Sequence, residues 1–70
     1  MDPKTKEMVA LSASVAGRCH PCFKHHLGKA RELGISDEEI KAVVDLAKRI
    51  SEVGNDRMFE FVNDVMKKEG

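Results

Sequence analysis

The sequence has no excess of charge of either sign. Its 70 residues contain 12 Lys and Arg against 12 Asp and Glu, and the formal net charge at pH 7 is zero. These charges are spread evenly, so no basic stripe points to a nucleic acid and no acidic tail points to a basic partner. We therefore expect no binding to nucleic acid.

The sequence also has no long hydrophobic run. The longest stretch without a charged residue, Met8 to Gly17, is ten residues long and rich in Ala and Ser. Such a stretch is too short for a membrane-spanning helix, and it lacks the basic start of a signal peptide. We expect a soluble, cytoplasmic protein with no membrane partner.

Cysteine is scarce, with only two residues in the chain. At most one disulfide can form, and a bond between Cys19 and Cys22 would close a loop too short to join distant elements. A single domain over residues 1–70 buries only about 60% of the surface of its unfolded chain, so its own core stabilises it weakly. We expect association between copies to compensate. In a reducing compartment, such a cysteine pair is more often reactive or metal-bound than structural.

The sequence shows the periodicity of helices and no pattern typical of strands. No window alternates apolar and polar residues between turn signals, and neither repeats nor low-complexity segments are present. Helices are expected from Pro3 to Ala16, from Pro21 to Gly34, from the Ser36 capping box to Gly54, and from Asn55 to the C-terminal lysines. The sequence therefore predicts an all-α fold, a small bundle of about four helices that oligomerisation completes.

The residues with the richest chemistry lie in the segment from Gly17 to Gly28. Cys19 and Cys22 stand at the start of a predicted helix, where free N–H groups and the positive end of the helix dipole favour a thiolate. This position should lower the pKa of at least one thiol below about 8.5. Both sulfurs share one face of the first turn, so the second can resolve a mixed disulfide that the first has formed. The pattern indicates reversible dithiol chemistry.

The three histidines of this segment differ in their placement. His26 follows Cys22 by four residues and shares its helix face, whereas His25 is rotated by about 100°. An imidazole at the His26 position can take a thiol proton and return it near neutral pH. We expect His26 to act as the proton relay, and His20 and His25 to be solvated surface residues.

Two metal-dependent interpretations compete with dithiol chemistry. A c-type haem needs a histidine directly after the second cysteine, and Phe23 occupies that position. Zinc could take Cys19 and Cys22 with His25 or His26 as ligands. These ligands all come from one and a half helical turns, which cannot easily surround a tetrahedral ion. We expect no cofactor, and a Cys/His metal site stays as an alternative.

Together with Glu7, these residues resemble the redox branch of the carboxymuconolactone decarboxylase and AhpD-like superfamily. That branch carries a glutamate twelve residues before a Cys-x-x-Cys, and a histidine four residues after the second cysteine. Glu7, Cys19, Cys22 and His26 meet all four positions. The resemblance continues through the Gly-Ile-Ser-Asp-Glu-Glu-Ile segment and covers about residues 5 to 53.

The resemblance implies an all-helical subunit that assembles into trimers, hexamers or other symmetric oligomers. It also implies a cysteine pair that cycles between dithiol and disulfide, with Glu7 and His26 as its proton relay. The substrate would be a peroxide or a disulfide, and the partner a peroxiredoxin or a dithiol carrier of the lipoyl type. The decarboxylase branch lacks the cysteine pair, so lactone chemistry is not expected. The resulting prediction is an AhpD-like peroxidase or disulfide reductase.

Some alternatives stay open at the level of the sequence. Glu7 lies at the edge of an apolar stripe that includes Leu11 and Val15, and it could instead be a solvated glutamate favoured by the helix dipole. The order of attack is undecided, because Cys22 is closer to His26 while Cys19 is nearer the helix start. Cys22 is the better candidate for the relay-linked sulfur. A non-enzymatic oligomeric helical module is the main alternative function.

Overall fold

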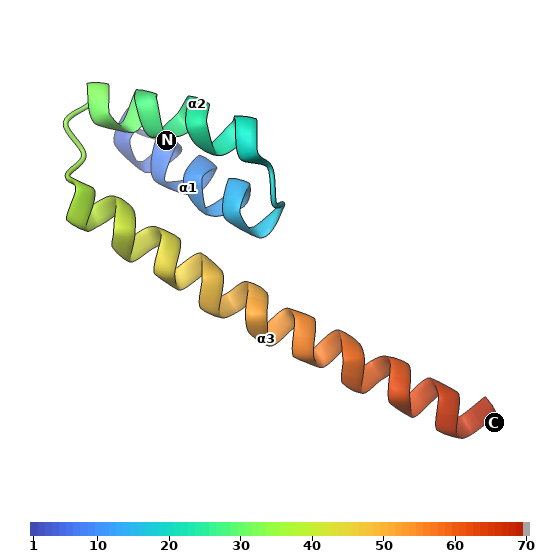
Figure 1. The fold of residues 1–70 in the computed structure, drawn as a ribbon. Helices are drawn as coiled ribbons and strands as arrows, with labels where there is room; N and C mark the ends of the chain where they lie inside the picture. The colour runs from blue at the N-terminus through green and yellow to red at the C-terminus, as the bar shows by residue number, and fades with distance from the viewer. Residues whose placement is uncertain (70) are drawn as a thin grey trace.

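Three α-helices and two short connections make up residues 1–69, the part of the chain that the computed structural model describes. The helices are α1 (Pro3–Ala16), α2 (His20–Glu32) and α3 (Asp37–Glu69). In Figure 1, α1 and α2 lie side by side, and α3 runs past them and far beyond. The described residues contain no strand, so the predicted all-α class is confirmed.

Helix α1 begins where Asp2 satisfies the free N–H groups of its first turn. The Asp2 carboxylate accepts hydrogen bonds from the backbone N–H of Lys4 at 3.0 Å and of Thr5 at 3.1 Å. The Thr5 hydroxyl donates to the same carboxylate at 2.6 Å. Pro3 follows at the first helical position, where its missing N–H leaves no bond unmade. The predicted start at Pro3 and the predicted end at Ala16 are both confirmed.

The connection between α2 and α3 depends on a left-handed residue. Gly34 has φ of +80°, and the N–H of Ile35 donates to the carbonyl of Ala30 at 3.1 Å, which closes the last turn of α2. Ser36 then begins α3, because its hydroxyl accepts the N–H of Glu39 at 3.1 Å. This short connection places the first part of α3 against α1.

The core lies where the three helices meet near the connection between α2 and α3. Its buried side chains are Leu11, Ala30, Ile35 and Ile40. The half-buried side chains packed around them are Met8, Phe23, Leu27 and Val44. This cluster is small, and it joins the α1–α2 pair to the first part of α3 alone.

Helix α3 does not end at Gly54, so the prediction of a separate last helix beginning at Asn55 is wrong. One continuous helix of 33 residues takes the place of the two predicted helices, and three helices form the bundle instead of about four. A glycine ends a helix when it adopts the left-handed conformation, and Gly54 does not. An interior glycine costs a helix about 1 kcal/mol, and helix-forming residues on both sides of Gly54 can offset that cost.

Charged residues occur along the whole of α3. Lys48 and Glu52 approach to 3.8 Å, and Arg57 and Glu60 to 3.1 Å, in exposed pairs within the helix. Such pairs stabilise a helix by a few tenths of a kcal/mol each. Over residues 1–69, no helix combines the length and the apolar character that crossing a membrane requires.

The described chain is strongly elongated. Its dimensions are 54 × 20 × 20 Å and its radius of gyration is 16.0 Å. A compact domain of this length has a radius of gyration of about 11 Å. Figure 1 shows the reason, since the C-terminal part of α3 (orange to red) extends away from α1 and α2. We refer to residues 52–68 as the distal segment.

Candidate functional site

Cys19 and Cys22 form a disulfide at the first turn of α2. Cys19 is the N-cap residue, and its Sγ accepts the N–H of Cys22 at 3.3 Å. The left-handed backbone of Arg18, with φ of +53°, turns the chain from α1 into this cap. Cys19 is half-buried and Cys22 is exposed. The Cys19 sulfur is therefore held against the helix start, and Cys22 is the more exposed residue of the pair.

The predicted relay residues contact each other across the α1–α2 interface. Oε2 of Glu7 lies 2.6 Å from Nδ1 of His26. The Glu7 side chain is only 7% exposed and the His26 side chain is 27% exposed. When Nδ1–H donates to the carboxylate, the ring is held in one orientation and Nε2 is left to exchange a proton. Glu7 is therefore not the solvated glutamate of the alternative interpretation.

The disulfide and His26 border one hollow of about 270 Å³. Its walls are formed by Ala10, Ala13, Ser14, Cys19, Cys22 and His26. The first three residues come from α1, and their small side chains leave space beside the sulfurs. Glu7 lies behind His26 through the 2.6 Å contact. The structure thus brings all four predicted site residues together, although their roles stay predictions.

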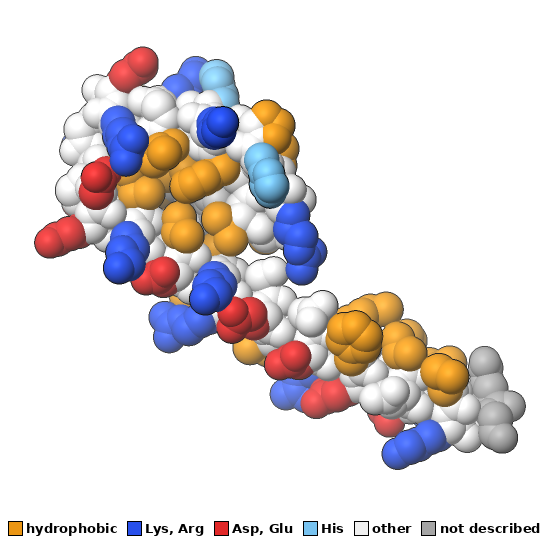
Figure 2. All heavy atoms as spheres, viewed as in Figure 1, with side chains coloured by type: hydrophobic (Ala, Val, Ile, Leu, Met, Phe, Trp, Pro, Cys, Tyr) orange, Lys and Arg blue, Asp and Glu red, His pale blue; other side chains and the backbone are white. Residues whose placement is uncertain are grey.

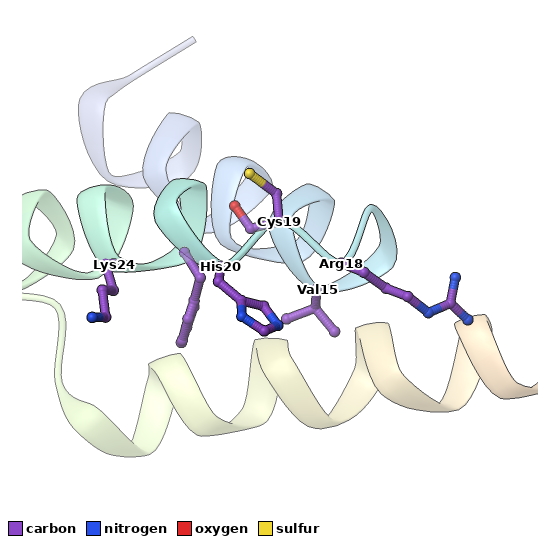
Figure 3. Close-up of a pocket in the computed structure, with 7 residues that line it drawn as sticks. Val15, Arg18, Cys19, His20 and Lys24 are labelled. Carbon is purple, nitrogen blue, oxygen red and sulfur yellow. The ribbon is translucent and has the colours of Figure 1, made fainter.

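A larger hollow of about 520 Å³ lies near the other side of the Cys19 backbone. It is lined by Ser14, Val15, Arg18, Cys19, His20, Phe23 and Lys24. In Figure 3, the side chains of Val15 and His20 point toward α3, whereas the sulfur of Cys19 points the opposite way. A molecule in this hollow does not face the sulfur, so the smaller hollow is the one that lies beside the disulfide.

The other two histidines do not border the smaller hollow. His25 is exposed, and its ring meets the His26 ring edge-on with centroids 4.9 Å apart. His20 is exposed and lines the larger hollow. Within residues 1–69, no three or more His, Cys, Asp or Glu side chains are grouped so as to hold a metal ion.

Sequence reasoning missed Ser14 as a residue of the site. Ser14 is buried, and its hydroxyl donates to the carbonyl of Ala10 at 2.7 Å. The buried residues of α1 are Glu7, Leu11 and Ser14, so its buried face is rotated away from the predicted stripe that includes Val15. The available signal was the seven-residue spacing from Glu7, which places Ser14 two turns further along the same face.

Comparison with known families gives one match. The sequence model of the carboxymuconolactone decarboxylase family matches residues 1–60 of the chain. The matched range includes α1, α2, both cysteines and residues 37–60 of α3. Searches of curated proteins and of solved structures find no match.

Proposed function

Since the chain belongs to the carboxymuconolactone decarboxylase family and carries a disulfide between Cys19 and Cys22, we propose that it is an AhpD-like thiol–disulfide oxidoreductase. Its substrate is a peroxide or a disulfide. The observation that carries the proposal is the 2.6 Å contact between Glu7 and His26 beside the disulfide. A buried carboxylate that orients an imidazole is the arrangement a thiol needs for proton transfer.

In the proposed reaction, the reduced dithiol loses two electrons to a hydroperoxide. His26 takes the proton of the Cys22 thiol, and the Cys22 thiolate attacks one oxygen of the O–O bond. An S–O bond forms while the O–O bond breaks, and the alcohol leaves with the proton that His26 held. The Cys19 thiol then attacks the Cys22 sulfur, an S–S bond forms and the S–O bond breaks. Hydroxide leaves with the Cys19 proton as water.

An external dithiol returns the protein to its reduced state. Its thiolate attacks the sulfur of Cys22, the more exposed of the two cysteines, and Cys19 leaves as a thiolate. The N–H of Cys22, which already contacts the Cys19 sulfur, is placed to stabilise that leaving group at the start of α2. A second thiolate of the donor resolves the mixed disulfide. A dithiol carrier of the lipoyl type fits this step as donor, and an oxidised peroxiredoxin fits the opposite step as acceptor.

The proposal can be tested by following thiols through one turnover. The protein is reduced, freed of reductant and mixed with stoichiometric hydrogen peroxide, and its thiols are titrated over time. Cys22→Ser should abolish turnover with a dithiol reductant. His26→Ala should slow oxidation by about a hundredfold or more, which is the usual contribution of a positioned proton-transfer group.

His25→Ala provides the matched control, because His25 directly precedes His26 on α2 and touches its ring edge-on but does not line the hollow beside the disulfide. Its oxidation rate should stay within about twofold of the wild type, as expected for an exposed surface residue. Full activity in Cys22→Ser would disprove the dithiol mechanism. Equal rates for His25→Ala and His26→Ala would disprove the relay while leaving the dithiol chemistry intact.

A further inference from the structure

The distal segment of α3 exposes large hydrophobic side chains. Met58 is 57% exposed, and Phe59 and Phe61 are each 61% exposed. Figure 2 shows hydrophobic side chains gathered along this part of the helix, beyond the body formed by α1 and α2. A helix of this length is only marginally stable in water by itself, and most helices rely on packing of their apolar face. The distal segment therefore needs a partner surface.

A stripe of mostly apolar residues runs along one face of α3, and Ser51 and Gly54 are its two members without an apolar side chain. Residues that alternate by four and three positions share a face, as in a coiled coil. The stripe consists of Ile40, Val44, Ala47, Ser51, Gly54, Met58, Phe61 and Val65. Its first three members face the body, where Ile40 and Ala47 are buried. The same face thus continues without a change of phase from the core into the distal segment.

We propose that the distal segment packs against the distal segment of a second copy of this chain, with the two helices antiparallel. In this arrangement, Met58 of one copy lies opposite Phe61 of the other, and Gly54 lies opposite Val65. Gly54 suits such a position, because a Cβ atom there meets nothing within 4 Å and the missing side chain lets a second helix approach. The stripe also explains why Gly54 lies within a helix and does not end it.

The charges beside the stripe select the antiparallel orientation. Arg57 and Asp64 both lie on one edge of the stripe, at equivalent positions one heptad apart, where residues set partner choice and orientation in coiled coils. In an antiparallel pair, Arg57 of each copy faces Asp64 of the other, which gives two opposite-charge contacts. In a parallel pair, Arg57 would face Val62 of the other copy. Charge complementarity therefore favours the antiparallel pair.

The symmetry and the size of this contact predict a two-fold dimer and the strength of its association. The two segments meet through the same surface on both copies, which is a closed two-fold contact. About four turns of helix on each side bury less than the roughly 800 Å² per partner of a standard stable interface, so we expect a dimer that dissociates on dilution. Among the oligomers that the family resemblance implies, a hexamer can contain such two-fold contacts, whereas a lone trimer cannot.

Two phenylalanines allow a matched test. Phe61 lies on the stripe and Phe59 lies off it, and the two have the same 61% exposure. Sedimentation equilibrium of the full chain should show that Phe61→Glu raises the dimer dissociation constant by about a hundredfold, as expected for a central anchor. Phe59→Glu should change it by less than about threefold. A monomeric wild type at millimolar concentration, or equal effects of the two substitutions, would overturn the proposal.

A mixing experiment tests the orientation and does not depend on whether a stripe variant folds fully. Arg57→Asp places two like-charge contacts in its own antiparallel dimer, and Asp64→Arg does the same with the opposite sign. Each variant alone should dimerise about tenfold more weakly than the wild type. An equimolar mixture should recover wild-type association, because both contacts of the mixed dimer are then attractive. A mixture that associates no better than its components would disprove the antiparallel register.

Discussion

His26 Nδ1 lies 2.6 Å from Glu7 Oε2, although the two residues are nineteen positions apart and belong to different helices. The packing of α1 on α2 creates this contact. No buried side-chain nitrogen or oxygen among the described residues lacks a hydrogen-bond partner, and the Glu7–His26 contact is part of the reason. The same contact therefore stabilises the packing of α1 on α2 and orients His26 for the proposed proton transfer.

Glu7→Gln separates these two contributions. The amide keeps the volume of the carboxylate and can still accept from Nδ1–H, but it carries no charge to balance an imidazolium. We expect the oxidation rate of the reduced protein to fall by about 10- to 100-fold, while the far-ultraviolet circular dichroism spectrum is unchanged. Glu32→Gln, at an exposed glutamate of α2, should leave the rate unaltered. A wild-type rate in Glu7→Gln would remove Glu7 from the proposed relay.

The relation between Glu7 and His26 also shows what local sequence signals can predict. Helix starts were predictable, because Asp2 and Ser36 act on residues two or three positions away. Grouping of Glu7 with the cysteines was predictable only from the spacing shared with a known family. The contact itself depends on how α1 packs on α2, and neither helix encodes that packing alone. Ser14 was missed for the same reason.

Gly54 was interpreted wrongly because a glycine has two opposite uses. It ends a helix when it turns left-handed, as Gly34 does, and it lets a second helix approach when it stays helical. The local sequence around Gly54 fits either use. The deciding feature is the stripe, which keeps its phase on both sides of Gly54 and so favours one uninterrupted helix.

Leu11→Ala tests how much the small core contributes. Leu11 is fully buried in the main hydrophobic cluster, and large-to-small substitutions of this kind cost about 2–5 kcal/mol. The whole domain is expected to be only marginally stable. Most of the helical circular dichroism signal should therefore be lost at room temperature. Val9→Ala, at a side chain that is 51% exposed on the same helix, should change the free energy of unfolding by less than about 0.5 kcal/mol.

The N-cap of α1 predicts a dependence of stability on pH. The Thr5 hydroxyl, with the N–H groups of Thr5 and Lys4, holds the pKa of the Asp2 carboxyl below its usual value of 3.8. A carboxyl with a lowered pKa in the folded state stabilises that state above its unfolded pKa, and this contribution is lost as the pH falls through the folded pKa. Asp2→Ala should therefore lower the Tm at pH 7.

The Tm difference between Asp2→Ala and the wild type should shrink as the pH falls from 3.8, the usual pKa of the carboxyl, through its lower pKa in the folded state. Thermal unfolding followed by circular dichroism between neutral and strongly acidic pH measures this difference directly. Asp45→Ala, at an exposed position within α3, serves as a control for general effects of acid. A Tm difference that stays constant over the whole range would show that the carboxylate charge does not stabilise the cap.

Two glycines with equal space around them should respond to alanine in opposite ways. A Cβ atom at Gly28 or at Gly34 meets nothing within 4 Å, so neither substitution causes a clash. Gly28 lies inside α2, where Gly28→Ala should stabilise the protein by about 0.5–1 kcal/mol through a less flexible unfolded chain. Gly34 has φ of +80°, where Gly34→Ala should cost about 1–2 kcal/mol. Urea unfolding of both variants measures the two signs, and stabilisation by Gly34→Ala would contradict the left-handed connection between α2 and α3.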